Sequence, residues 1–230
     1  MGPGSGVRPV KKFWKRLLFK GLPVYDFFEP AAHAVELRLW AFRGRPSPPP
    51  PAFKQRTVAG YGRRFSLTTL VETGTFLGDL ASAAGKTFER VVTIELDPHL
   101  YARARRRLAR RPNITVLHGD SGDLLPEVLE TLRGPCLFWL DAHYSGPLTA
   151  RAGPEPPILR ELRAVLAGPE EGQVVLIDDA CCFTGEGGYP ALEILENLVR
   201  DLRPGWAFEV RDDIVRCHAP RPGSAGPRRS

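Results

Sequence analysis

The sequence predicts an α/β fold, a doubly wound and mostly parallel sheet that ends in an antiparallel hairpin. From residue 66 onward, short apolar runs alternate with longer segments of helical periodicity. Each apolar run ends in a polar residue or a glycine turn, as strands do at the ligand-binding edge of open α/β sheets. The last two apolar runs, 206–210 and 214–218, flank Arg211-Asp212-Asp213 and predict a hairpin instead of another βα unit.

The alternating elements can be placed along the chain in order. The expected strands lie at 68–72, 90–95, 114–118, 136–141 and 173–178. The expected helices lie at about 78–84, 98–110, 122–132, 157–166 and 190–202. These βα units and the final hairpin give a sheet with one antiparallel strand.

The N-terminal 51 residues are expected to form a separate extension. Residues 10–20 predict a basic amphipathic helix, and residues 31–42 predict a second helix. The polyproline segment 47–51 is a stiff spacer that we take as the boundary to a main domain at 52–218, and residues 219–230 are expected to be a disordered basic tail. The helix at 10–20 could lie on an anionic membrane surface, or pack on the domain or on a partner subunit, as the arm of a homodimer.

The net charge of +6 comes from the two ends of the chain. Nine of the 32 basic side chains lie in residues 1–20 and 219–230, which contain no acid, so the body carries 23 basic against 26 acidic side chains. The arginine-rich segment 103–111 is expected to be the outer face of a helix whose Leu100, Ala104 and Leu108 face inward. A specific nucleic-acid surface spread over the domain is therefore not expected.

Cysteine usage and hydropathy favour a cytoplasmic protein. The four cysteines have neither C-x-x-C pairing nor zinc-like spacing, and Cys136 and Cys217 lie in strand-like apolar runs typical of a core. No stretch of the sequence approaches the roughly 20 apolar residues of a membrane span.

A glycine-containing turn follows the first expected strand and opens a helix. It reads Glu72-Thr73-Gly74-Thr75-Phe76-Leu77-Gly78. Its glycines allow the backbone to approach a ligand closely, and the following helix offers unpaired N–H groups. The sequence therefore predicts a nucleotide-like ligand at this turn, with five candidate contacts: Glu72, Thr73, Gly74, Thr75 and Gly78.

The ends of the other strands carry the remaining candidate residues. Glu95, 17 residues beyond Gly78, can accept both hydroxyls of a ribose, and Asp120 with Ser121 can lie near an adenine. The fourth strand ends at Asp141, followed by His143, and the fifth ends at Asp178-Asp179.

Taken in order, these motifs resemble those of class I S-adenosylmethionine-dependent methyltransferases, over roughly residues 60–218. The set comprises Glu-x-Gly-x-x-x-Gly, Ile-Glu-x-Asp-Pro, His-Gly-Asp-Ser and the late hairpin. The Glu-x-Gly-Thr-Phe-x-Gly form is similar to that of the metal-dependent catechol and caffeoyl-CoA O-methyltransferases, and the acidic residues resemble those of the macrocin-type sugar O-methyltransferases. The resemblance implies a Rossmann-like domain that binds S-adenosylmethionine, with Asp141 also at the cofactor, and Mg²⁺ held by Asp141, Asp178 and Asp179.

The chemistry of these side chains independently favours a cation. Carboxylates gathered at adjacent strand ends repel one another unless a cation neutralises them, and oxygen ligands suit Mg²⁺. A hydroxyl bound to Mg²⁺ loses its proton more easily, and His143 is placed in the sequence to take that proton, beside Asp141 at the catalytic centre. The expected enzyme is an O-methyltransferase that acts on a small molecule or on a sugar or glycan precursor.

The sequence is also compatible with other interpretations. The acceptor could be RNA or protein, or the chain could be a non-catalytic adaptor that retains the fold. An NAD-dependent oxidoreductase is disfavoured, because its phosphate-binding turn needs Gly-x-Gly-x-x-Gly. The Asp178-Asp179 pair could be a turn or helix cap, Glu72 could bind backbone amides, and His143 could be bonded within its own loop.

Overall fold

The structure is a computed structural model that describes residues 23–141, 156–168 and 172–220. The chain divides into two units after Gly44, and each is described by itself. In the first unit, helix α2 spans Pro23–Phe42 and begins earlier than the predicted start at residue 31. Proline is favoured at the first helical position, because its missing N–H would have no partner there. The helix expected at 10–20 and residues 221–230 of the expected tail lie outside the described residues.

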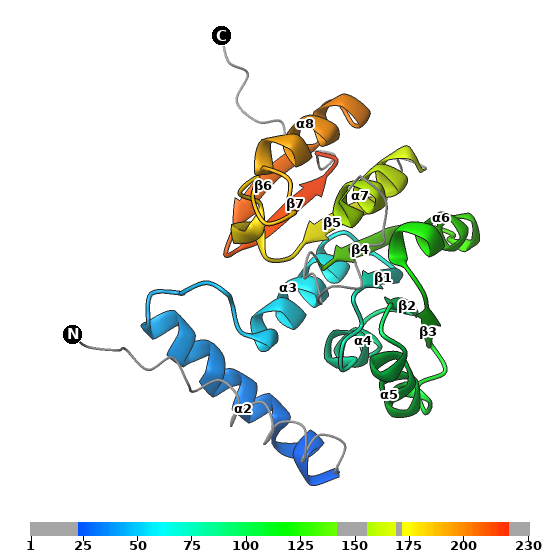
Figure 1. The fold of residues 1–230 in the computed structure, drawn as a ribbon. Helices are drawn as coiled ribbons and strands as arrows, with labels where there is room; N and C mark the ends of the chain where they lie inside the picture. Colours follow the sequence, from blue (N-terminus) through cyan, green and yellow to red (C-terminus); the bar gives the residue numbers. More distant parts are fainter. Residues whose placement is uncertain (1–22, 142–155, 169–171, 221–230) are drawn as a thin grey trace, which may run out of the picture. The chain divides into compact units, whose positions relative to one another are not determined.

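The second unit is built on a seven-stranded sheet with the order β3-β2-β1-β4-β5-β7-β6 (Figure 1). Strand β7 runs antiparallel to both of its neighbours, and the pairs among β1 to β5 are all parallel. The predicted fold class is therefore confirmed. The strands are β1 (Thr69–Thr73), β2 (Arg90–Glu95), β3 (Ile114–His118), β4 (Cys136–Leu140), β5 (Gln173–Ile177), β6 (Ala207–Arg211) and β7 (Ile214–His218).

The helices between the strands end within a few residues of their predicted bounds. They are α4 (Asp79–Ala84), α5 (Pro98–Leu108), α6 (Ser121–Thr131), α7 (Pro157–Ala167) and α8 (Leu192–Leu202). Two elements were not predicted: the short 3₁₀ helix η2 (Ala180–Cys182) and helix α3 (Pro51–Arg64). Pro51 is the first residue of α3, so the polyproline segment leads directly into a helix that belongs to the second unit.

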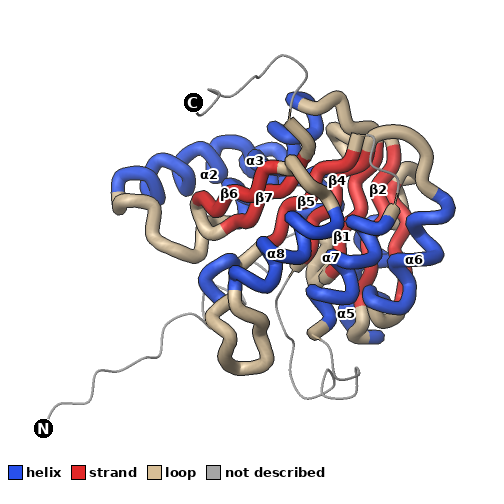
Figure 2. The backbone as a smooth tube through the Cα atoms, turned by 90° about the horizontal axis from the view of Figure 1, so that it is seen from above, coloured by secondary structure: helices blue, strands red, loops and turns tan. Residues whose placement is uncertain are grey.

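Helices lie against both faces of the sheet (Figure 2), and a hydrophobic core on each face holds the second unit together. Successive residues of a strand point to opposite faces. Accordingly, Phe138 and Leu140 pack with α6, α7 and α8, whereas Leu137 and Trp139 pack with α3, α4 and α5. The same alternation decides which side chains at the strand ends can meet.

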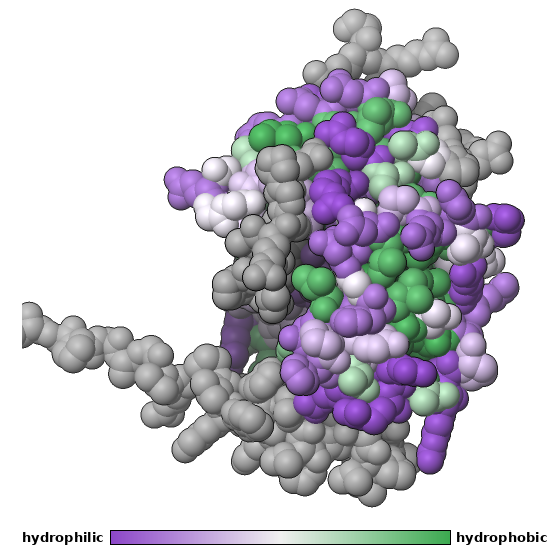
Figure 3. Space-filling model, turned by 45° about the vertical axis from the view of Figure 1, so that its right-hand side comes forward, coloured by the Kyte–Doolittle hydropathy of each residue, from purple (hydrophilic) through white to green (hydrophobic). Residues whose placement is uncertain are grey.

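The burial of the described residues agrees with several sequence interpretations. Cys136 and Cys217 are buried, and Ala104 and Leu108 are buried beneath the exposed arginines of α5. Hydrophilic residues cover much of the face shown in Figure 3, with smaller apolar areas between them. Among the described residues, no helix combines the length and apolar character that a membrane crossing requires.

Candidate functional site

The site lies where the strand order reverses, at the carboxyl ends of β1 and β4. Strand β1 pairs with β2 on one side and with β4 on the other. Ligands of open α/β sheets bind at such switch points, outside the carboxyl ends of the strands. The glycine turn follows β1, and Asp141 follows β4 directly.

Two glycines of the turn are needed for its shape. Gly74 has φ +81°, and a Cβ there would lie 3.0 Å from the Asp141 Cβ. Gly78 has φ +73°, and a Cβ there would lie 3.0 Å from a methyl carbon of Leu108. A side chain at either position would be strained and crowded, so the turn can pass close to Asp141 only with glycine.

The side chain of Glu95, at the end of β2, holds the turn in place. One carboxylate oxygen accepts the Phe76 N–H at 2.7 Å and the other accepts the Asp97 N–H at 3.0 Å. An ionised carboxylate has about four acceptor positions, and the contacts within the described part of the chain use two of them. Glu95 can therefore order the turn and still accept hydrogen bonds from a ligand.

Glu72 lies buried beneath the turn. Its carboxylate accepts a hydrogen bond from the Thr93 hydroxyl at 2.7 Å, and the hydroxyls of Thr93 and Thr75 are 2.6 Å apart. The pKa of Glu72 is raised to about 8, mainly by burial. The negative charges of Asp141 and Glu95 also raise this pKa, whereas the hydrogen bond from Thr93 lowers it. The described contacts give Glu72 and Thr75 a supporting role under the turn.

A second buried carboxylate, that of Glu161, was not found from the sequence. It accepts hydrogen bonds from the hydroxyls of Thr73, at 3.2 Å, and Ser121. The Thr73 hydroxyl in turn accepts the Asp141 N–H at 3.2 Å. Burial raises the pKa of Glu161 to about 7. Glu161 on α7 therefore ties together the ends of β1 and β4 and the start of α6.

The residues predicted near an adenine have structural contacts at the start of α6. Asp120 is the N-cap residue of this helix, and its carboxylate accepts the Gly122 N–H at 2.8 Å. The Ser121 hydroxyl donates to Glu161. Both residues lie at the carboxyl end of β3, next to the end of β2 that carries Glu95.

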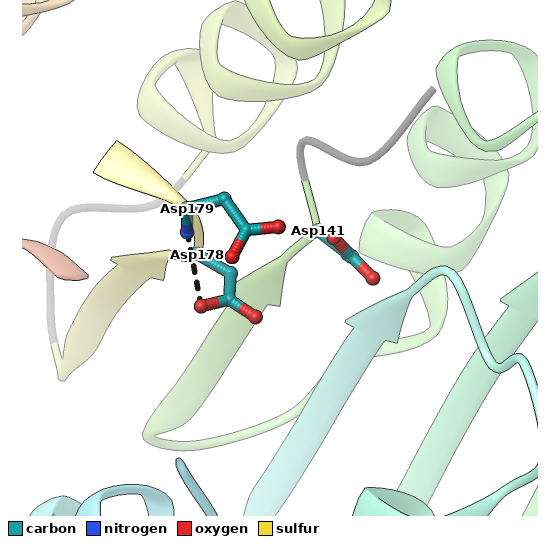
Figure 4. A group of neighbouring side chains, drawn as sticks. All are labelled: Asp141, Asp178 and Asp179. Atoms are coloured by element: carbon teal, nitrogen blue, oxygen red, sulfur yellow. Dashed lines mark hydrogen bonds between the residues drawn. The ribbon is translucent and has the colours of Figure 1, made fainter. Parts of the chain in front are cut away.

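The three aspartates predicted to bind a metal do come together. Asp178 and Asp179 follow β5, Asp141 follows the neighbouring strand β4, and one carboxylate oxygen from each lies within 4.8 Å of the others (Figure 4). The Asp179 N–H donates to the Asp178 carboxylate at 2.9 Å. Burial raises the pKa of Asp178 to about 7, although Lys54 opposes this shift.

Lys54, on α3, was not found from the sequence and reaches the same cluster. Its ammonium group forms an ion pair with Asp178 and lies 3.2 Å from Asp179 Oδ1. Burial alone would lower the pKa of Lys54, but the two aspartates together raise it above its ordinary value. In this structure the aspartate pair is thus neutralised in part by a side chain of the protein itself.

His143, the predicted general base, lies outside the described residues, as does the segment that follows it up to residue 155.

Comparison with known proteins identifies the fold. No family model matches the sequence, and no curated protein matches it. Among solved structures, the O-methyltransferase TomG from Streptomyces achromogenes, in complex with SAM, matches with a TM-score of 0.54 and 16% identity over 92% of this chain and 96% of that one. An O-methyltransferase from Bacillus cereus in complex with SAH matches with a TM-score of 0.52 and 13% identity, over 91% of this chain and 96% of that one. The chain has the class I methyltransferase fold.

A third similar structure is a caffeoyl-CoA O-methyltransferase, described as putative in its source, from Staphylococcus aureus. It matches with a TM-score of 0.51 and 14% identity, over 85% of this chain and 97% of that one. All three identities are low, so these likenesses concern the fold.

The buried Glu72 should make the protein less stable as the pH rises. Its pKa is raised in the folded state, so between about pH 4.5 and about pH 8 the folded chain holds a proton that the unfolded chain has released, and stability falls by up to about 1.4 kcal/mol per pH unit. Glu72→Gln cannot ionise and should lose less stability over this range. Denaturant titrations at about pH 5, 7 and 9 would measure the difference.

The matched control is Glu89→Gln, an exposed residue just before β2. It should keep the pH dependence of the parent protein. An unchanged dependence in Glu72→Gln would show that this carboxyl ionises normally in the fold.

Proposed function

We propose that the protein is an S-adenosylmethionine-dependent O-methyltransferase that uses Mg²⁺ and acts on a hydroxyl of a small molecule or a sugar. The observation that carries the proposal is the meeting of the glycine turn with three converging aspartates at the switch point of a methyltransferase fold. The similar structures support the reaction class, since they are described as O-methyltransferases, one in complex with SAM and one with SAH.

The cofactor would lie along the carboxyl ends of β1, β2 and β3. The fit is supported by the Gly74 turn, where a Cβ would fill the space beside Asp141, and by the two acceptor positions left on Glu95. Glu95 would accept the ribose hydroxyls, and Asp120 and Ser121 would border the adenine. Glu161 would keep Thr73 and Ser121 in place through its two hydrogen bonds.

The metal would lie between the carboxylates of Asp141, Asp178 and Asp179. The donor set fits Mg²⁺, because it consists of carboxylate oxygens that converge from adjacent strand ends. When bound, S-adenosylmethionine supplies an electrophilic methyl group and Mg²⁺ makes an acceptor hydroxyl more acidic. The aspartates would orient that hydroxyl toward the cofactor side of Asp141, and His143 would take its proton.

The cofactor assignment predicts that the protein binds S-adenosylhomocysteine and that Glu95→Gln weakens this binding about ten- to hundred-fold. A hydrogen bond to a charged group contributes about 1.5–3 kcal/mol, and the substitution removes the charge that the ribose hydroxyls would meet. Calorimetric titration would measure the affinity. Glu89→Gln should bind like the parent protein, and a parent protein that binds no S-adenosylhomocysteine would refute the cofactor assignment.

The metal assignment predicts that EDTA abolishes methyl transfer and that added Mg²⁺ restores it. Asp178→Asn should lose turnover while S-adenosylhomocysteine binding stays within a few-fold, because Asp178 lies on the β5 side of the site, away from Glu95. Mass spectrometry of methylated products from a panel of phenols and sugars would follow turnover. Asp201→Asn, at an exposed position on α8, is the matched control, and full activity in EDTA would contradict the assignment.

The assignment of His143 as general base predicts a drop in turnover of about 10²- to 10⁴-fold in His143→Gln, with cofactor binding unchanged. His99→Gln, at an exposed position at the start of α5, should leave turnover as it is. Single-turnover measurements at saturating cofactor would separate the chemical step from binding. Turnover in His143→Gln equal to that of the parent protein would assign the proton transfer to another group.

A further inference from the structure

The proposed chemistry gives no role to Lys54, although this side chain reaches the aspartate cluster. Its ammonium group contacts Asp178 Oδ2 and lies 3.2 Å from Asp179 Oδ1. These two carboxylates belong to the set proposed to hold the metal ion. A metal-binding side chain is ordinarily an oxygen, nitrogen or sulfur donor, whereas the Lys54 ammonium is a cation.

Simultaneous binding of the Lys54 ammonium and a metal ion to this aspartate pair is electrostatically unfavourable. Mg²⁺ binds carboxylate oxygens at about 2.0–2.1 Å. An ion bound to Asp179 Oδ1 would therefore lie within about 5 Å of the Lys54 nitrogen in its present position, given the 3.2 Å contact. Two cations at that separation in a partly buried site repel each other strongly. The ammonium and a divalent ion thus compete for the same pair of carboxylates.

The Lys54 side chain can leave while its helix stays in place. Lys54 lies in the first turn of α3, its side chain is 21% exposed, and its ammonium sits at the end of a flexible four-carbon stem. Other contacts hold the segment around Lys54: the Ser47 hydroxyl donates to the Asp213 carboxylate, the Gln55 amide donates to the Asp79 carbonyl oxygen, and Val58 and Tyr61 of α3 are buried in the core. Rotation of the Lys54 side chain can therefore free the ammonium group while these contacts keep α3 in place.

We propose that Lys54 is an internal counter-ion of the aspartate cluster that a divalent metal ion must displace, so that Lys54 sets the affinity of the site for metal. Without metal, Lys54 keeps Asp178 and Asp179 paired and ordered. When a metal binds, the ammonium moves toward solvent on the α3 side. This inference rests on the metal site of the proposed function, but its tests measure metal binding and lysine accessibility independently of turnover.

The first test measures Mn²⁺ binding to the full-length protein by the loss of the free Mn²⁺ signal in electron paramagnetic resonance. Lys54→Met removes the charge and keeps much of the side-chain volume, so it should bind Mn²⁺ at least about ten-fold more tightly than the parent protein. Lys54→Arg keeps the charge and should not gain affinity. Arg56→Met removes a positive charge from an exposed position on the same helix and is the matched control for a general charge effect.

The second test needs no variant in the site. Lysine acetylation by an amine-reactive reagent, followed by peptide mass spectrometry, reports accessibility in the parent protein. Acetylation of Lys54, measured relative to the exposed Lys86, should rise when Mg²⁺ replaces EDTA. The labelling experiment uses the parent protein, so it tests the inference even if Lys54→Met fails to fold.

The outcomes separate this inference from the proposed function. If Asp178→Asn removes Mn²⁺ binding, but Lys54→Met binds no more tightly than the parent protein and Lys54 labelling does not respond to Mg²⁺, the counter-ion inference is overturned and the metal site stands. If neither the parent protein nor Lys54→Met binds Mn²⁺, both the metal site and its displacement of Lys54 are overturned. Cofactor binding would still be tested separately by S-adenosylhomocysteine.

Discussion

The concentration of carboxylates at one edge of the sheet is the constraint on which the rest of the site depends. Glu72, Asp141, Glu161, Asp178 and Asp179 approach one another where β1, β4 and β5 end, and all but Asp141 are buried. Ionised together without partners, they would be very costly to bury. Two effects reduce this cost: burial raises the pKa values of Glu72, Glu161 and Asp178, and the Lys54 ammonium forms ion pairs with Asp178 and Asp179.

The alternation of side chains along the strands determines which partner each residue at a strand end can contact. Leu137, Trp139 and Asp141 share one face of β4, and Leu176 and Asp178 share the corresponding face of β5, on the side covered by α3. Thr73 follows Glu72 on β1, so its side chain points to the opposite face of the sheet. There its hydroxyl donates a hydrogen bond to the carboxylate of Glu161 on α7. Lys54 and Glu161 therefore lie on opposite faces of the sheet and contact residues at neighbouring strand ends.

Much of this arrangement could be predicted, because apolar runs and the residues that end them are properties of the local sequence. The apolar runs gave the strand bounds. The rule that parallel strands share a carboxyl edge then predicted that Asp141 meets Asp178 and Asp179 and that Glu95 lies beside the glycine turn. Lys54 and Glu161 were missed because their roles depend on packing between elements distant in sequence. A signal was available: Glu161 lies on the same helical stripe as Ile158, Leu162 and Val165, and Lys54 on that of Val58 and Tyr61. A charged residue on a buried stripe needs a partner.

The two charged residues from the helices differ in what their surroundings permit. Glu161 is buried and accepts two hydroxyl hydrogen bonds, so moving it would leave the buried Thr73 hydroxyl and the part-buried Ser121 hydroxyl without this acceptor. Lys54 is partly exposed, and its flexible stem begins in the first turn of a helix that other contacts anchor. A buried, hydrogen-bonded support on one face of the sheet is thus combined with a flexible, partly exposed charge on the other. Under the counter-ion proposal, this combination would let the aspartates stay in position while a divalent ion replaces the Lys54 ammonium.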